Sequence, residues 1–172
     1  MKRNGPIVIT GFMGCGKSKV ARELALRRNV VMVDLDDWIA RRVGRNPAQL
    51  INEDGELAFR EIETNALRDL LRSGEAGVIA LGGGAWIEKA NRELIDQFGC
   101  TSIWLDTPFE ICWERIAASE EDRPLGRTRE EAQARYDRRK PTYALAQFHI
   151  AVSTVQTLDD LISAIETKLG SL

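Results

Sequence analysis

Residues 7–18 read IVITGFMGCGKS, and this stretch decides the fold. Four β-forming residues, Ile7–Thr10, are followed by Gly11–Ser18, which match the pattern of a glycine, four further residues and then Gly-Lys-Ser or Gly-Lys-Thr. The stretch is therefore expected to form a strand, a glycine-rich loop and the first turn of a helix. The same alternation of strand and helix continues along the rest of the chain.

Further strands are predicted by short runs rich in β-branched and aliphatic residues. Four such runs alternate with amphipathic helical stretches, at Val30–Asp34, Val78–Leu81, Thr101–Leu105 and Phe148–Val152. Most of them are nearly continuous in Val, Ile and Leu, which is typical of strands that helices cover on both faces. The expected fold class is therefore α/β, a doubly wound parallel sheet of five strands.

Length and charge narrow the possible partners. The 172 residues predict a single domain that spans 1–172. Because 24 Lys and Arg nearly balance 26 Asp and Glu, the net charge is −2 and no global field favours nucleic acid or an anionic membrane. We therefore expect no nucleic-acid partner and no membrane association. The chain is also expected to act as a monomer.

The N-terminus and the cysteines predict a cytoplasmic protein. Only four β-type residues precede Gly11, far fewer than a signal peptide or a membrane span needs. Cys15, Cys100 and Cys112 are odd in number and fit neither a CxxC pair nor a zinc spacing, so reduced thiols are expected. The single histidine, His149, lies in an apolar-rich run and is expected to be a structural strand residue.

Two segments break the alternation of strands and helices. Residues 38–71 are too many for one crossover helix and contain Gly44, Pro47 and Gly55, which predicts two or three helices that form a small substrate-facing region. Residues 119–130 carry charges of both signs and almost no apolar side chains. This composition suits a mobile lid over a site, and an ordinary surface loop is the alternative.

The glycine-rich loop predicts a cradle for phosphate groups. Its backbone N–H groups are expected to wrap the phosphates, and the helix N-terminus adds positive potential. Lys17 is expected to reach the β and γ phosphates, and the Ser18 hydroxyl to ligate Mg²⁺. ATP with Mg²⁺ is therefore the expected ligand, and the residues predicted to bind ATP here are Gly11, Gly14, Cys15, Gly16, Lys17, Ser18 and Lys19.

Carboxylates end the second predicted strand. Asp34 and Asp36 lie two residues apart at the edge of the sheet where α/β folds bind ligands. Phosphoryl transfer to a hydroxyl needs one carboxylate near the metal and another that accepts the hydroxyl proton, and these two residues can divide the roles. The alternative is that one of Asp34, Asp36 and Asp37 only caps the next helix, and we expect this role for Asp37.

A run of three glycines and two arginines suggest an acceptor site. Gly82–Gly84 follow the third strand, where three missing side chains favour close approach of a ligand to bare main chain; a tight turn is the alternative. Arg60 and Arg139 are candidates for a planar fork that binds a carboxylate through two hydrogen bonds. Either arginine alone would be interpreted as a surface residue.

These motifs together closely resemble shikimate kinases. The resemblance rests on Gly11–Ser18, Asp34-Leu35-Asp36, Gly55-Glu56 with Phe59-Arg60 and Glu63, Gly82–Gly84, Arg123-Pro124-Leu125 and Arg139-Lys140-Pro141-Thr142-Tyr143. The match is ordered and spans residues 7 to about 155. It implies a P-loop fold like that of nucleoside monophosphate kinases, with sheet order 2-3-1-4-5, and transfer of the ATP γ-phosphate to the 3-hydroxyl of shikimate.

The resemblance also implies roles on the acceptor side. Asp36 would bind the shikimate hydroxyls and act as the catalytic base. Asp34 would hold Mg²⁺ through water, beside Ser18. Shikimate would be held, with two arginines on its carboxylate, by Arg60, Arg139 and the backbone of Gly82, Gly83 and Gly84.

On the nucleotide side, the resemblance implies that Lys17 and Arg123 act in catalysis. Arg123, within the predicted lid, would reach the transferring phosphate as an arginine finger does. Arg115 occupies roughly the place of an arginine that stacks on adenine. Phe59 is expected either to shape the acceptor pocket or to serve as a core aromatic residue.

Other functions stay open from the sequence. Leu35, Lys19 and Gly126 depart from the family pattern, which leaves room for a kinase that acts on a related polyol acid. A different class is a non-catalytic sensor that binds ATP and a carboxylate ligand. A pure binding module, however, needs neither a base such as Asp36 nor a transition-state arginine such as Arg123.

Overall fold

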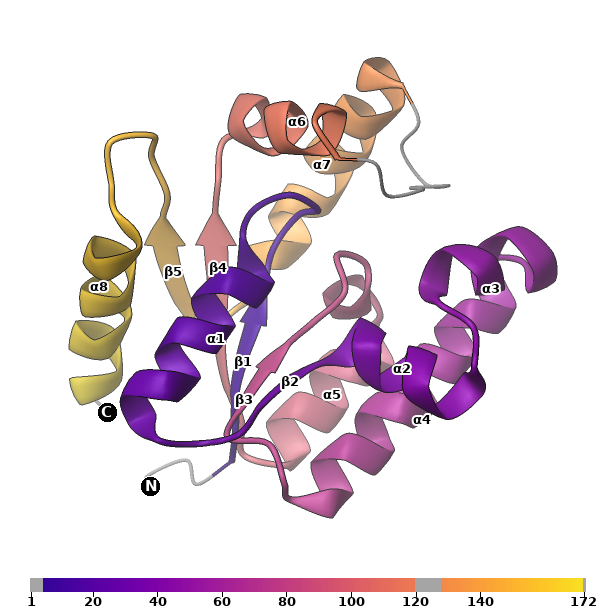
Figure 1. Ribbon diagram of the computed structural model, residues 1–172, viewed down its shortest axis with the longest axis horizontal. Helices are drawn as coiled ribbons and strands as arrows, with labels where there is room; N and C mark the ends of the chain where they lie inside the picture. Colours follow the sequence, from indigo (N-terminus) through magenta and orange to yellow (C-terminus); the bar gives the residue numbers. More distant parts are fainter. Residues whose placement is uncertain (1–4, 120–127, 172) are drawn as a thin grey trace.

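A computed structural model describes residues 5–119 and 128–171. Its sheet has five parallel strands in the order β2-β3-β1-β4-β5. This confirms the predicted α/β class and the order 2-3-1-4-5. The strands, seen in Figure 1, are β1 (Ile7–Thr10), β2 (Met32–Asp34), β3 (Val78–Ala80), β4 (Thr101–Asp106) and β5 (Phe148–Ala151).

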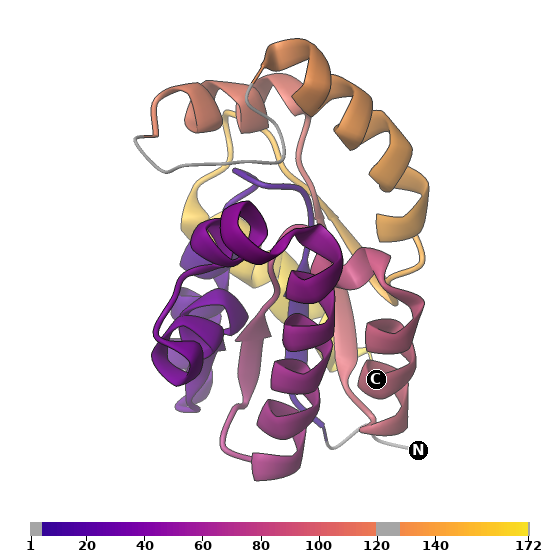
Figure 2. The same cartoon turned by 90° about the vertical axis from the view of Figure 1, so that its right-hand side faces the viewer.

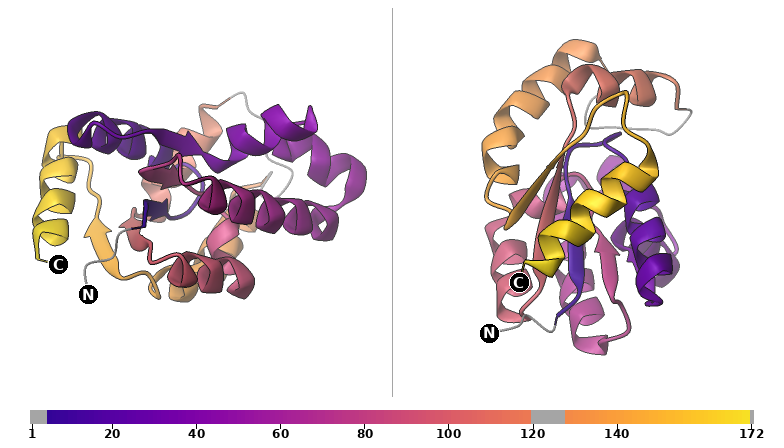
Figure 3. Two further views of the ribbon diagram at one scale, coloured as in Figure 1. Left: turned by 90° about the horizontal axis from the view of Figure 1, so that it is seen from below. Right: turned by 90° about the vertical axis from the view of Figure 1, so that its left-hand side faces the viewer.

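Helices cover both faces of the sheet. Helices α1 and α8 pack together on one face, and α5 packs on β4 from the opposite face (Figure 3). In the described part of the chain, no helix combines the length and apolar content needed to cross a bilayer. The helices are α1 (Lys17–Arg28), α2 (Leu35–Val43), α3 (Pro47–Asp54), α4 (Glu56–Ser73), η1 (Ala85–Ile87), α5 (Lys89–Gln97), α6 (Phe109–Ala117), α7 (Arg129–Tyr143) and α8 (Leu158–Gly170).

The centre of the sheet is fully buried. Every residue of β1 and β3 is buried, as the continuous aliphatic runs predicted, whereas β5 at the edge alternates between buried and exposed residues. In the register of the sheet, Ile9 of β1 and Asp34 of β2 are both opposite Ala80 of β3. The loops that follow these three strands therefore begin side by side at one edge.

The segment predicted to hold two or three helices holds three. Helices α2, α3 and α4 follow one another and extend away from the strands (Figure 1). The breaks coincide with Gly44, a left-handed C-cap, and Gly55, which ends α3. Asn46 begins α3 with a capping box to Gln49, and Pro47 occupies its first turn. The helical segment is confirmed, and its substrate-facing role remains a prediction.

Helices α6 and α7 lie beyond the carboxyl ends of the strands (Figure 2). Most of the predicted lid, including Arg123, lies outside the described residues. The loop was predicted to extend to about residue 130, and Arg129 and Glu130 already belong to α7. The side chain of Thr128 accepts a hydrogen bond from the Glu131 backbone, and the two residues form a capping box that starts the helix earlier.

Candidate active site

The glycine-rich loop needs three of its glycines. Gly11, Gly14 and Gly16 all have positive φ angles, of 147°, 76° and 98°. Gly16 is the N-cap of α1, and the first turn of this helix contains no acidic side chain. Backbone N–H groups at the helix start are therefore available to an anion without a competing carboxylate.

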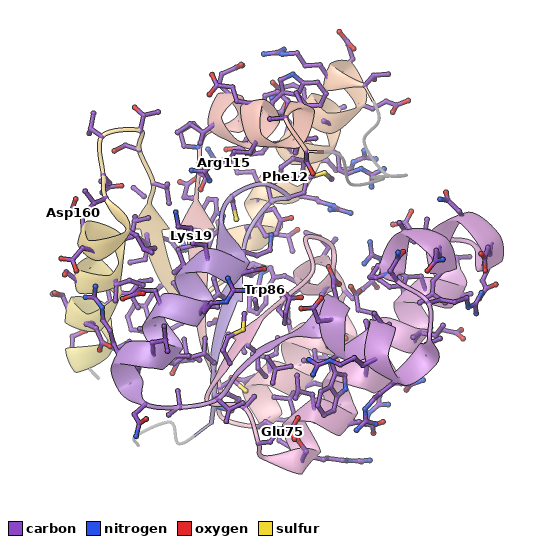
Figure 4. All side chains as sticks on the ribbon, in the orientation of Figure 1. Phe12, Lys19, Glu75, Trp86, Arg115 and Asp160 are labelled. Carbon is purple, nitrogen blue, oxygen red and sulfur yellow. The ribbon has the colours of Figure 1, made fainter. Side chains whose placement is uncertain are left out.

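The Lys17 ammonium is folded over this loop. It is buried, and its Nζ donates hydrogen bonds of 2.9 Å to the carbonyl oxygens of both Gly11 and Phe12. The cation is thus held against the cradle by weak neutral acceptors, which bound phosphate groups can replace. Lys19 is exposed on α1 (Figure 4), so no contact of its side chain with the loop supports its predicted role.

Arg115 joins α6 to the loop. Its Nη1 donates a 3.0 Å hydrogen bond to the carbonyl oxygen of Gly14, and Figure 4 places its side chain beside the loop. The guanidinium therefore lies next to the predicted phosphate cradle. Its role in stacking on adenine remains a prediction.

Ser18 and Asp34 bring oxygen ligands together. The Ser18 hydroxyl donates a 2.5 Å hydrogen bond to Asp34 Oδ2, and Asp34 Oδ1 accepts one of 3.0 Å from the Asp36 backbone N–H. This pair fits Mg²⁺, which takes one or two protein ligands and completes its shell with phosphates and water. Asp34 is thus the N-cap of α2, and the expectation that Asp37 caps this helix was wrong, because the helix already begins at Leu35.

Asp36 projects from the first turn of α2 toward the three glycines. A Cβ built on Gly82 would lie 2.8 Å from Asp36 Oδ1 and 3.3 Å from Glu63 Oε1. Burial, reinforced by the charge of Asp34, raises the Asp36 pKa to about 6, against the opposing effects of Lys17 and Arg60. Asp36 is therefore a carboxylate that is ionised at neutral pH and still readily accepts a proton.

Arg60 is fixed by two carboxylates of its own helix. Its Nη1 donates a 2.8 Å hydrogen bond to Glu63 Oε2, and its Nη2 one of 3.2 Å to Glu56 Oε1. The guanidinium lies over Gly84, where an added Cβ would approach Arg60 Nη2 to 2.2 Å. At Gly83, the corresponding Cβ would lie 3.3 Å from the Met13 backbone nitrogen of the phosphate loop. The missing side chains of the glycine run thus allow Asp36, Arg60 and the phosphate loop to lie close to its backbone.

Glu63 was not assigned to the predicted site, although it lies within it. The residue is 1% exposed, and among the described residues its Oε1 has no hydrogen-bond partner. Burial raises the Glu63 pKa to about 7, although the charge of Arg60 and the hydrogen bond from it act to lower the pKa. Its position three residues after Arg60 on a helix was the signal that could have identified it.

Helix α7 brings Arg139 to the same place. Arg139 is 7% exposed and lies beside the Tyr143 hydroxyl, which donates a hydrogen bond to the Gly83 carbonyl oxygen. The Trp86 indole N–H donates a 2.9 Å bond to the Thr142 carbonyl oxygen and ties η1, which directly follows the glycines, to α7. The two predicted carboxylate-binding arginines, Arg60 and Arg139, therefore both adjoin the glycine run.

Comparison with known proteins decides the family. The family model described as shikimate kinase matches residues 13–169. The chain belongs to the shikimate kinase family. A shikimate kinase from Cereibacter sphaeroides is 38% identical over 147 residues, which cover 84% of this chain and 72% of the relative.

Solved structures of shikimate kinases share the fold. The structure from Acinetobacter baumannii, a complex with shikimate, has a TM-score of 0.87 at 30% identity and covers 99% of this chain and 95% of its own. The structure from Bacteroides thetaiotaomicron has a TM-score of 0.85 at 26% identity, and the match covers 96% of this chain and 98% of that structure's chain. The fold is therefore that of P-loop kinases similar to nucleoside monophosphate kinases.

Proposed function

We propose that this member of the shikimate kinase family transfers the γ-phosphate of ATP to the 3-hydroxyl of shikimate, giving shikimate 3-phosphate and ADP. The observation that carries the proposal is the place of Asp36. Its half-buried carboxylate interacts electrostatically with both Lys17, in the phosphate loop, and Arg60, beside the glycine run. A base in this position can serve an acceptor hydroxyl that faces a bound nucleotide.

ATP would bind at the glycine-rich loop. The positive-φ glycines and the free start of α1 support phosphate binding through the backbone. Lys17 would exchange its two carbonyl acceptors for the β and γ phosphates, where its charge stabilises the transition state. Arg115 adjoins this loop, and Arg123 would add a second positive charge at the transferring phosphate.

Mg²⁺ would be held by Ser18 and, through water, by Asp34. Their oxygen atoms already lie together, which supports this assignment. When bound, the ion would neutralise charge on the phosphates.

Shikimate would bind between the glycine run and the arginines. Its carboxylate would lie on Arg60 and Arg139, and its ring against the backbone of Gly82–Gly84. The 3-hydroxyl oxygen would then attack the γ-phosphorus while the bond from that phosphorus to the β–γ bridging oxygen breaks. The hydroxyl proton would pass to Asp36, and ADP would leave with the electron pair of the broken bond.

The proposal extends to the organisation of the whole molecule. One domain would carry both sites, with helices α2–α4 on the acceptor side and residues 119–128 as the lid. The three cysteines are buried, and their odd number and their spacing fit neither a CxxC pair nor a zinc site, which supports a reducing compartment such as the cytoplasm. The protein would act as a monomer, with ATP and shikimate as its small-molecule partners.

The proposal is tested by ADP release with a panel of acceptors. Purified protein is assayed with Mg-ATP alone and with shikimate, quinate or gluconate, and Lys17→Ala controls for contaminating kinases. We expect turnover that depends on shikimate and is nearly abolished in the Lys17→Ala protein. Binding of shikimate without turnover would instead support the sensor, and faster turnover with another acid would support a kinase of a related polyol acid.

A further inference from the structure

A third arginine lies one helical turn from Arg139. Arg135 lies four residues before Arg139 on α7, so the two side chains project from the same face of the helix, one turn apart. Helix α7 packs against η1, which continues the glycine run, and the bond from Trp86 to the Thr142 carbonyl oxygen lies at the C-terminal end of this contact. The residue was not among the sequence predictions.

The arginines around the glycine run differ in whether a carboxylate pairs with them. Arg60 has Glu63 and Glu56 as partners, at 2.8 Å and 3.2 Å. In residues 5–119 and 128–171, neither Arg135 nor Arg139 forms an ion pair with a carboxylate, and the buried Nε of Arg135 has no hydrogen-bond partner. Arg139 is buried and Arg135 is half-buried, so both cations are partly withdrawn from water without a carboxylate partner, which favours the binding of an anion there.

The charged neighbours of Arg135 come from both α7 and α4. Burial lowers the Arg135 pKa, and the charges of Arg139, Arg138 and Arg60 lower it further, while Glu56 raises it. Arg135 thus lies within the field of residues from both α7 and the start of α4. Those two helices carry the two arginines already assigned to the acceptor carboxylate.

We propose that Arg135 is a third arginine of the acceptor site, which binds the carboxylate of the acceptor together with Arg60 and Arg139. The inference rests on the proposed function, because it takes shikimate as the acceptor. The inference predicts selectivity for charged acceptors. Arg135 increases the affinity for an acceptor with an ionised carboxylate but not for one with an ester in that place.

The test compares shikimate with methyl shikimate, which lacks the negative charge. Dissociation constants for both are measured by calorimetry, and KM values by ADP release, for wild type, Arg135→Gln and Arg138→Gln. Arg138 is an exposed neighbour on the same helix, so its variant removes the same charge away from the proposed contact. Arg135→Lys serves as a second variant that keeps the charge but not the fork.

We expect Arg135→Gln to weaken shikimate binding about tenfold, as for the loss of one charge-assisted hydrogen bond. In Arg135→Gln, binding of the methyl ester and the KM for ATP should stay near wild-type values. The affinity of Arg135→Lys for shikimate should lie between those of wild type and Arg135→Gln. Arg138→Gln should bind both acceptors as wild type does. Unchanged selectivity in Arg135→Gln, or equal loss for both acceptors, would overturn the inference. If Arg135→Gln does not fold, wild-type selectivity in Arg135→Lys would overturn it.

The wild-type data separate this inference from the proposed function. If wild type phosphorylates shikimate while the Arg135 variants keep its selectivity, the inference alone fails. If wild type neither binds nor phosphorylates shikimate, the proposed function fails and the role of Arg135 fails with it.

Discussion

At the scale of single residues, two carboxylates of the site, the buried Glu63 and the half-buried Asp36, are ionised less readily than in water. Asp36 and Glu63 both have raised pKa values, of about 6 and about 7, and burial is the main cause for each. An acid whose pKa is higher in the folded than in the unfolded protein destabilises the fold once it ionises. Their removal should therefore separate stability from activity.

For Asp36→Asn we expect kcat to fall by roughly 10²–10⁴, because the acceptor of the hydroxyl proton is lost. At pH 8 the same variant should be more stable than wild type, by roughly 1–3 kcal/mol, because an ionised, half-buried carboxylate is gone. Single-turnover transfer and denaturant unfolding on one preparation measure both effects. A less stable but fully active variant would contradict the assignment, since Asp36 would then serve the fold and not the proton transfer.

For Glu63→Gln the expected signature is a change with pH. The native pKa is raised from 4.5 to about 7, so neutral Glu63 favours the fold below pH 4.5, and this contribution is lost as the pH rises through 7. The unfolding free energy of wild type should fall relative to that of the variant over this range, by roughly 1–3 kcal/mol. Urea titrations at pH 5 and pH 8 measure the unfolding free energies of both proteins. A difference between wild type and variant that does not change with pH would contradict the raised pKa.

At the scale of elements, the glycine run positions side chains from two helices. In Gly84→Ala the new methyl group would occupy the place of the Arg60 guanidinium, which must move. Because the displaced group is the end of a flexible side chain, we expect a folded protein with a shikimate KM raised at least several-fold and a nearly unchanged KM for ATP. Gly170→Ala is the matched control, since a Cβ there meets nothing within 4 Å.

Steady-state kinetics and thermal unfolding check this prediction. Equal effects of Gly84→Ala on the KM values for ATP and shikimate would show that Arg60 does not hold the acceptor. A large loss of stability would show that the glycine is needed for the fold itself.

The elements were predictable where local patterns determine them. Continuous aliphatic runs located all five strands to within two residues at either end, and glycine and proline marked the breaks between α2, α3 and α4. Helix starts were less predictable, because several neighbouring polar residues can act as the cap. Asp34 rather than Asp37 caps α2, and Thr128 starts α7 inside the predicted lid.

At the scale of the whole molecule, the site combines segments that are far apart in the chain. The sequence motifs identified the phosphate loop, Asp36, Arg60 and Arg139 separately, but burial and mutual contact depend on packing. Glu63 lies three residues after Arg60 on one helix, so its place beside Arg60 could have been predicted. Arg135 resembles an ordinary surface charge of an amphipathic helix, and only the approach of α7 to the glycine run distinguishes it.

Ligand binding should stabilise the whole molecule. We expect a non-hydrolysable ATP analogue with Mg²⁺, and shikimate, each to raise the Tm, because both bind the folded protein only. The shift with shikimate should be smaller in the Gly84→Ala protein, while the shift with the nucleotide stays as in wild type. Scanning calorimetry over a range of ligand concentrations measures the shifts, and a shikimate shift that is unchanged by Gly84→Ala would place the acceptor elsewhere.

The central claim is that phosphate is transferred to one hydroxyl of shikimate, with Asp36 as the base. Phosphorus NMR of the product formed from Mg-ATP and shikimate tests it most directly, with a proton–phosphorus correlation to locate the new ester. We predict one phosphate monoester, coupled to the proton on C3, formed with an equal amount of ADP and almost none of it in the Asp36→Asn protein. An ester at another position, ATP hydrolysis to inorganic phosphate alone, or an undiminished product signal in the Asp36→Asn protein would contradict the account.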